Sequence, residues 1–177
     1  ASLSIAVKAV GSAVTKGFHP NDENELAGEA KVNNLSVLVF DESGAQLIGY
    51  GWQATNSEGE ASILNVPAMT MRAQIVIVSN TPENSLAGVT SYSDFESKLA
   101  QLADQSQSNL VMSSPVITTQ APLVKGDNYL GYASMGSENI NGIAEPVEIT
   151  RLAARLDLVN VKTDFTKTLL RNRTVRV

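Results

Sequence analysis

The N-terminal stretch Leu3–Val10 alternates between apolar and mostly polar or small side chains. The apolar positions are Leu3, Ile5, Val7 and Ala9. The intervening positions are Ser4, Ala6 and Lys8. Because successive side chains of a strand point to opposite faces, this pattern predicts a half-buried β-strand. The weakly patterned segment 11–29 follows, so this strand must pair with a distant part of the chain.

The composition predicts a folded domain with an aliphatic core. The chain has 177 residues, of which 43% are hydrophobic and 5% aromatic. Its net charge of −5 argues against binding to a phosphate backbone, which requires a basic surface. Most basic residues fall in 151–177, where we interpret them as the solvent-facing side chains of late strands. We therefore expect no nucleic-acid partner.

The segment Lys31–Asp41 predicts a central strand. Its run Leu35–Phe40 is almost continuously apolar, which is typical of a strand that is buried on both faces. Turn residues follow at 41–44, and Gln46–Gln53 returns as a second strand. The two strands are expected to form a hairpin.

The rest of the chain predicts short strands and one helix. The strands are expected over Glu58–Leu64, Thr70–Asn80, Leu110–Met112, Val116–Thr119, Ala121–Lys125, Tyr129–Ala133, Pro146–Thr150 and Leu152–Val161. Helical spacing appears in Ser91–Gln105, where Ser93 and Glu96 match a capping box. This order indicates a mainly β fold, a β-sandwich of two mainly antiparallel sheets with one short helix.

Catalytic constellations are missing from the sequence. The chain has no cysteine, and its single histidine, His19, lies in the weakly patterned segment. A serine triad or a zinc site would need more partners than this. The paired carboxylates Glu58/Glu60 and Glu145/Glu148 are interpreted as solvated side chains. We therefore expect no enzyme activity and no cofactor.

Two weaker binding features remain open. The acidic cluster Asp22, Glu23 and Glu25 departs from a calcium-loop pattern at Leu26, so a solvated loop is favoured over a surface cation site. Trp52 is read as a strand-packing aromatic, with a ligand platform as the alternative. The residues therefore favour a binding or structural role over catalysis.

Three stretches, in this order, resemble the fimbrillins of Bacteroidales, the subunits of type V pili. They are 28–41 (GEAKVNNLSVLVFD), 109–114 (NLVMSS) followed by 122–132 (PLVKGDNYLGY), and 146–155 (PVEITRLAAR). The resemblance implies a transthyretin-like β-sandwich over 1–165 and no enzymatic activity. Residues 166–177 would then be a linker or the first strand of a C-terminal domain, so we expect the chain to be a fragment of a longer protein.

The resemblance also implies how such a subunit assembles. Fimbrillins are exported as lipoproteins to the outer membrane surface, and the lipid anchor of the precursor is their contact with the membrane. An extracellular trypsin-like protease, usually Arg-specific, cuts behind the first strand, and a strand of a neighbouring subunit takes its place. Here the exchangeable strand would carry Leu3, Ile5, Val7 and Ala9, and Lys16 is the candidate processing site because 11–30 has no other basic residue.

The implied partners are other pilus subunits, in a homo- or hetero-polymer, and host or bacterial surface receptors. Two alternatives stay open. The chain could be a surface β-sandwich that binds glycan or protein without polymerising. It could also be an anchor or accessory subunit of the pilus whose first strand is never cut.

Overall fold

The computed structural model describes residues 1–10, 30–100, 106 and 108–152. The strands are β1 (Ser2–Val10), β2 (Lys31–Asp41), β3 (Leu47–Glu58), β4 (Glu60–Pro67), β5 (Ala73–Ser79), β6 (Met112–Ser113), β7 (Ile117–Thr118), β8 (Asp127–Leu130) and β9 (Val147–Arg151). The helical elements are α1 (Tyr92–Ala100) and the 3₁₀ segments η1 (Ala133–Glu138) and η2 (Ile140–Gly142). The predicted mainly β fold with a short α-helix is confirmed.

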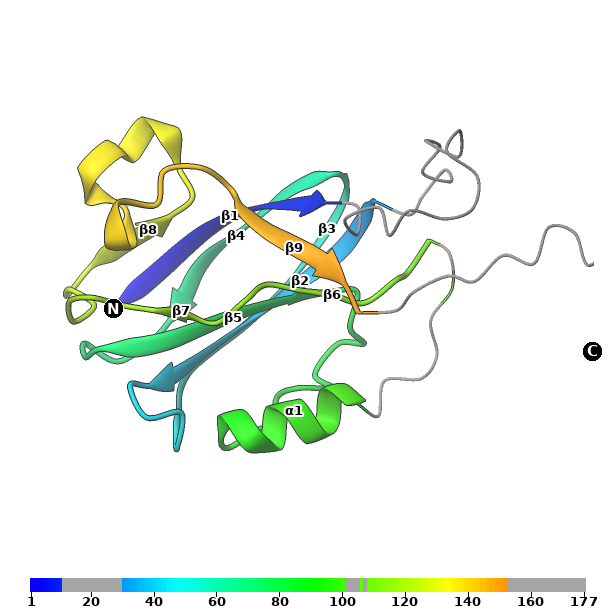
Figure 1. Ribbon diagram of the computed structural model, residues 1–177, viewed down its shortest axis with the longest axis horizontal. Coiled ribbons are helices and arrows are strands. Elements are labelled where there is room, and N and C mark those ends of the chain that lie inside the picture. Colours follow the sequence, from blue (N-terminus) through cyan, green and yellow to red (C-terminus); the bar gives the residue numbers. More distant parts are fainter. Residues whose placement is uncertain (11–29, 101–105, 107, 153–177) are drawn as a thin grey trace, which may run out of the picture.

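The strands form one curled sheet, not the two predicted sheets, because β6 and β9 link its two halves. The order is β3-β2-β5-β6-β9-β1-β4, with β7 paired to β5 and β8 paired to β1. The curl brings β1, β4 and β9 over β2 and β5, and the main core fills the space between these two halves (Figure 1). Most pairings are antiparallel, as predicted. However, β1 runs parallel to both β8 and β9, because long connections rather than hairpins join these strands to it.

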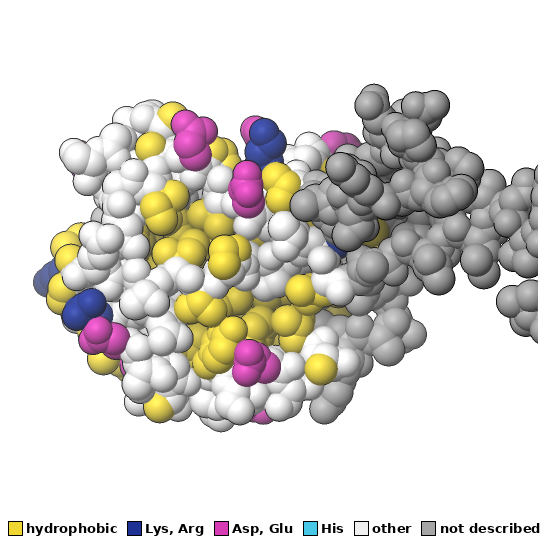
Figure 2. All heavy atoms as spheres, viewed as in Figure 1, with side chains coloured by type: hydrophobic (Ala, Val, Ile, Leu, Met, Phe, Trp, Pro, Cys, Tyr) yellow, Lys and Arg dark blue, Asp and Glu magenta, His cyan; other side chains and the backbone are white. Residues whose placement is uncertain are grey.

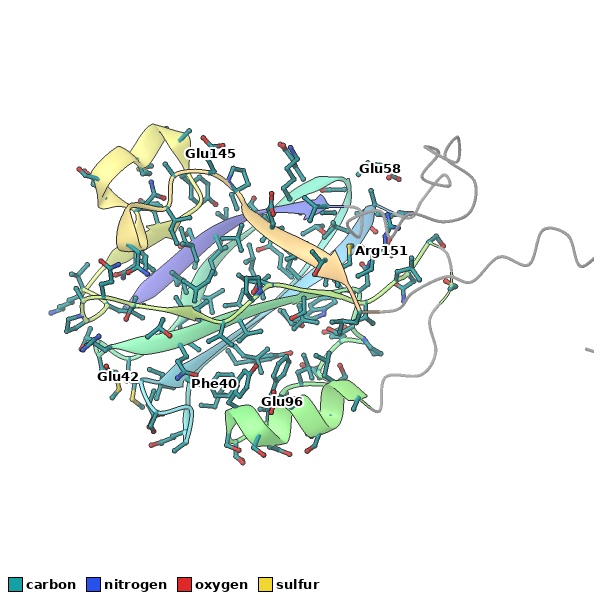
Figure 3. The ribbon with its side chains drawn as sticks, in the orientation of Figure 1. Phe40, Glu42, Glu58, Glu96, Glu145 and Arg151 are labelled. Atoms are coloured by element: carbon teal, nitrogen blue, oxygen red, sulfur yellow. The ribbon has the colours of Figure 1, made fainter. Side chains whose placement is uncertain are left out.

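Strand β2 is buried on both faces, which confirms the reading of its apolar run. Leu35, Val37 and Val39 belong to the main core inside the curled sheet. Leu38 and Phe40 belong to a second cluster on the outer face, which is covered by α1 through Phe95 (Figure 3). The helix therefore closes the outer face of β2 and β5, while the other half of the sheet closes their inner face.

Two glycines in β3 allow β4 to pass close to it. A Cβ at Gly49 would lie 2.5 Å from the Pro67 carbonyl oxygen, and one at Gly51 would lie 2.7 Å from Val66 Cγ2. Any larger residue would push β4 outward. The sheet can therefore curl almost onto itself at this point.

Several predicted strand limits differ from the structure. Gly59 adopts a φ of 78° and makes the turn, so β3 continues to Glu58 and β4 begins at Glu60. Residues 121–125 do not form the predicted strand, because the Leu123 N–H bonds to the Met71 carbonyl oxygen and the Val124 N–H bonds to the Asn128 side chain. Residues 153–177 lie outside the described part, and with them the predicted domain boundary at 165.

The N-cap of α1 lies two residues before the predicted one. Ser91, not Ser93, caps the helix: its Oγ accepts a hydrogen bond of 3.2 Å from the Asp94 N–H. Asp94 in turn accepts a bond of 3.0 Å from the Thr90 N–H. The helix starts here because the Tyr92 N–H bonds to Gly44 O in the turn before β3, a tertiary contact that the sequence pattern does not contain.

We expect Ser91→Ala to lower the free energy of unfolding by about 1 kcal/mol, because the helix loses its N-cap acceptor. The exposed Ser93→Ala is the matched control and should change it by much less. Urea denaturation followed by circular dichroism measures both values. A larger loss in Ser93→Ala would contradict the assignment of the cap.

Candidate functional site: the position of the first strand

Strand β1 is the element that the sequence singled out, and its apolar side chains lie in the main core. Leu3, Ile5 and Val7 have no exposed surface, whereas Ala9 is partly buried at the end of the strand. Lys8 is exposed on the opposite face. The structure therefore gathers the four predicted residues on the inner side of β1.

The backbone of β1 is hydrogen-bonded along both edges. It pairs antiparallel with β4, where Leu3 lies opposite Val66 and Ile5 opposite Ile63, with a register shift between them. Its other edge pairs first with β8 and then with β9. Without β1, both neighbouring edges and the apolar slot between them would be exposed, and only another extended chain could pair with both.

The change of partner from β8 to β9 occurs beside Gly131. This residue has a φ of 85°, and a Cβ there would lie 2.7 Å from the carbonyl oxygen of Ala6. Sequence reasoning missed this role. The available signal was a glycine directly after the predicted strand residue Leu130, because a close backbone approach favours glycine.

Asn128 holds the other end of β1. Its Nδ2 donates to the carbonyl oxygens of Ser2, Val124 and Gly126 at 3.2, 3.0 and 3.1 Å, and its Oδ1 accepts from the Val124 N–H at 2.9 Å. The Ser2 N–H also donates to Gly126 O at 2.8 Å. Its bond to β1 was not predicted from the sequence.

The described residues that flank 11–29 both bind the β3–β4 turn. The Ala9 N–H donates to the Gly59 carbonyl oxygen at 2.6 Å, and the Gly59 N–H donates to the Ala30 carbonyl oxygen at 3.1 Å. The candidate processing site Lys16 lies outside the described residues, as do His19 and the acidic cluster 22–25.

The remaining candidates do not assemble into a reactive site. Within the described ranges, no three His, Asp or Glu side chains come together as a possible metal site. Glu58 and Glu145, one from each predicted carboxylate pair, lie at the periphery of the molecule (Figure 3). Trp52 is partly buried on β3.

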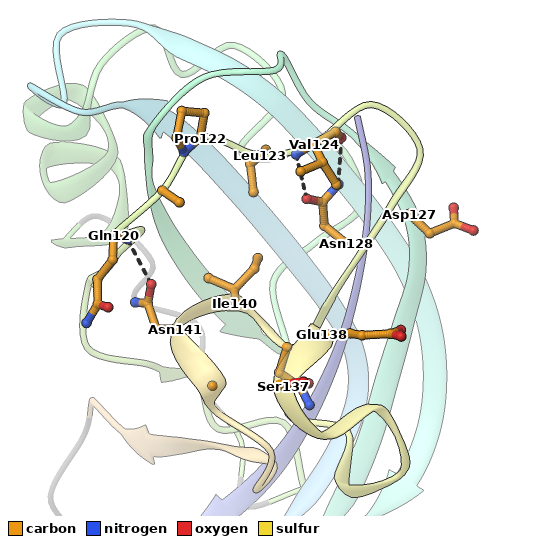
Figure 4. A pocket seen from close by; sticks show the side chains of 13 residues that line it. Gln120, Pro122, Leu123, Val124, Asp127, Asn128, Ser137, Glu138, Ile140 and Asn141 are labelled. Atoms are coloured by element: carbon orange, nitrogen blue, oxygen red, sulfur yellow. Dashed lines mark hydrogen bonds between the residues drawn. The ribbon is translucent and has the colours of Figure 1, made fainter.

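A surface pocket of about 440 Å³ lies between the 120–124 loop and the segment from η1 to η2 (Figure 4). Leu123, Val124 and Ile140 contribute apolar lining, and Asp127 and Glu138 contribute carboxylates. Asn141 connects the two sides, because its side chain donates to Thr118 O at 2.8 Å and accepts from the Gln120 N–H at 2.8 Å. The pocket is thus a built feature beside β8, near the beginning of β1.

A family model described as "Major fimbrial subunit protein (FimA)" matches residues 1–151, which include all the strands described above. The chain belongs to this FimA family. The family is one of fimbrial structural subunits, not of enzymes. The predicted resemblance to the fimbrillins of Bacteroidales is therefore confirmed.

Individual FimA-family relatives agree with this membership. A Parabacteroides distasonis protein named "Putative fimbrium tip subunit Fim1C" is 49% identical over 179 residues, which cover 100% of this chain and 48% of that protein. The Porphyromonas gingivalis "Major fimbrium subunit FimA type-2" is 29% identical over 76% of this chain and 33% of its own length. The chain thus spans about half or less of these relatives.

Solved structures show the same fold. A crystal structure of a "putative cell adhesion protein" from Parabacteroides distasonis has a TM-score of 0.77 and 47% identity, over 90% of this chain and 48% of that one. The P. gingivalis tip fimbrial protein Mfa3 has a TM-score of 0.51 at 14% identity, over 85% of this chain and 48% of that one, which supports the fold. Among the described residues, no helix has the length and apolar character needed to cross a membrane.

Replacing Ile5 with Asp is expected to lower the free energy of unfolding of the uncut chain by at least about 3 kcal/mol, because a carboxylate would be buried in an apolar slot without a partner. Val7→Asp should behave similarly. Lys8→Gln, on the exposed face of the same strand, is the control and should stay within about 0.5 kcal/mol. Melting temperatures of Ile5→Asp and Lys8→Gln that agree would show that β1 is not a core strand.

Gly131→Ala is expected to destabilise the chain by more than about 2 kcal/mol, since the new Cβ would collide with the backbone of β1 and the φ is unfavourable for alanine. Gly59→Ala has a similar positive φ but no atom within 4 Å of the added Cβ. It therefore measures the backbone strain without the collision. Equal losses for the two variants would contradict the close approach of Gly131 to Ala6.

Proposed function

We propose that this chain is part of a surface fimbrial subunit whose strand β1 is a removable segment. Cleavage in 11–29 leaves β1 attached through hydrogen bonds and apolar contacts, and a strand from another subunit then replaces it. Leu3, Ile5, Val7 and Ala9 are the positions that the incoming strand has to match. A head-to-tail contact of this kind does not close on itself, so it builds a filament.

The observation that carries the proposal is the central place of β1 in the sheet. A segment at the N-terminal end of the described chain supplies three fully buried side chains and is paired on both edges. Within the given sequence, the segment 11–29 connects it to the rest of the fold. Family membership supports assembly with other fimbrial subunits at the cell surface.

Lys16 is the proposed cleavage site. It is the one lysine between Gly11 and Ala30, and that segment has no arginine. Cleavage there would therefore need a protease that accepts lysine. Limited trypsin treatment should cut there first, and mass spectrometry should identify the new N-terminus at Gly17. Lys16→Ala should retain β1 under the same treatment.

Strand replacement can be tested with a fluorescent peptide of sequence Ala1–Val10. Chain cut at Lys16 should take up the peptide and release its own β1, whereas uncut chain should not. Fluorescence anisotropy measures the uptake. A peptide carrying Ile5→Asp should enter at least about a hundredfold less, because the buried carboxylate costs several kcal/mol.

Two results would overturn the proposal. In the first, trypsin leaves 11–29 intact under conditions that preserve the fold. In the second, the cut chain excludes the peptide even at concentrations where its own β1 has dissociated. Filament formation by the longer protein after cleavage, seen by electron microscopy, would extend the result from strand replacement to assembly.

A terminal position in the fimbria is a second candidate, and the likeness to a relative named as a tip subunit favours it. A subunit whose β1 stays in place offers no slot for another strand, so a filament would end at that subunit. The N-terminal residue of the protein recovered from cells distinguishes the two. An N-terminus that retains β1 and the segment 11–29 would indicate an end or anchor, and Gly17 would indicate a unit that accepts a strand.

The pocket beside β8 favours a third candidate, a binding module for glycan or protein that does not polymerise. Its mixed lining of aliphatic and carboxylate side chains could hold a ligand. Binding of the intact monomer to a glycan array, reduced by Asp127→Asn but not by Glu83→Gln, would support this reading.

A further inference from the structure

Three large apolar side chains are exposed where β1 begins: Met69 at 54%, Met71 at 39% and Val124 at 59% exposure. We call them the methionine rim. They lie outside the apolar slot described above. Methionine adapts its shape to a partner, which makes it common at surfaces that bind polypeptides.

Hydrogen bonds place the rim around the first residues of β1. The Ala68 N–H donates to Ala1 O at 3.0 Å, directly before Met69. The Leu123 N–H donates to Met71 O at 3.0 Å, directly before Val124. The rim thus consists of the two segments on either side of the chain that enters the β1 position.

The pocket described above continues the rim. Val124 belongs to both, and Leu123 and Ile140 extend the apolar surface inward. An exposed apolar rim beside a partly apolar pocket is the arrangement in which one anchoring side chain contributes most to an interface. This apolar surface is therefore suited to contact with a polypeptide.

Charged side chains lie at both ends of β1. At the Val10 end, Lys8 lies opposite Glu60 in the pairing with β4. At the Ala1 end, Asp127 lies opposite Ser2, and the Arg72–Glu42 ion pair follows Met71. A chain leaving at the Ala1 end also meets the exposed methionine rim.

The described chain ends far from the rim. The Leu152 N–H bonds to Val111 O, beside β6, and β9 runs away from the N-terminal end of β1 (Figure 1). Figure 2 shows that apolar side chains also gather in the middle of the viewed face, between the two halves of the sheet. The rim is distinct from that area, because its residues surround Ala1.

We propose that the methionine rim docks the stretch of a neighbouring subunit that adjoins its inserted strand and emerges at the Ala1 end. The inference rests on the proposed strand replacement and adds to it a second contact outside the slot. The docked stretch is apolar, with an aliphatic side chain that enters the pocket beside Val124. The slot then selects the strand, and the rim slows its departure.

The test uses full-length chain cut at Lys16 and three fluorescent peptides. One has the sequence Ala1–Val10, and the other two carry Leu-Val-Leu or Ser-Gly-Ser before it. Since all three contain the β1 sequence in its own direction, each extension emerges at the Ala1 end. We expect the apolar extension to dissociate about tenfold more slowly than the polar one, which corresponds to about 1.4 kcal/mol.

Variants assign that difference to the rim. The double variant Met69→Ser/Met71→Ser should remove it, and because both side chains are exposed, the fold should be unaffected. Leu152→Ser is the matched control, since Leu152 is 49% exposed but lies at the other end of the fold. It should retain the full difference.

The outcomes separate the two proposals. If all three peptides bind and dissociate at equal rates, the docking surface is refuted while strand replacement stands. A difference that survives Met69→Ser/Met71→Ser also refutes it. If no peptide enters the cut chain, strand replacement fails and the docking surface fails with it.

Discussion

The fold depends on the insertion of β1 between β4 on one side and β8 and β9 on the other. This strand fills the main core with Leu3, Ile5 and Val7 and closes both backbone edges. Its neighbours come from distant parts of the chain, so its contribution is tertiary throughout. On its C-terminal side the segment 11–29 connects it to β2.

The stabilisation that β1 gives the sheet comes from its side chains and backbone hydrogen bonds, and does not require a covalent link to β2. Side chains such as Leu3 stabilise the sheet as long as any suitable strand occupies the position. Two contacts also constrain the backbone path of the strand in this position. Gly131 lies close to the Ala6 backbone, and Asn128 binds the carbonyl of Ser2. A replacement strand therefore has to match both the apolar pattern and the backbone path. Under the proposed function, these requirements would select the strand that replaces β1.

The second core cluster has a different role. Leu38, Phe40 and Phe95 pack on the outer face of β2 and β5, away from β1. This layer gives β2 apolar contacts that do not depend on the occupant of the slot. The half of the sheet under α1 would therefore keep this packing in the proposed replacement of β1.

The sequence by itself determined the strands with strong local patterns. The alternation in Leu3–Val10 and the apolar run Leu35–Phe40 each bury their side chains as predicted, because local periodicity decides which side chains face a core. It also excluded cysteine chemistry, and its ordered stretches indicated the family. Local pattern failed at Ser93, since the contact of Tyr92 with Gly44 fixes the helix start. The tertiary structure decided the partners of β1, the parallel pairing with β8 and β9, and the roles of Gly131 and Asn128. Those features depend on contacts between residues more than fifty positions apart, which no local pattern records.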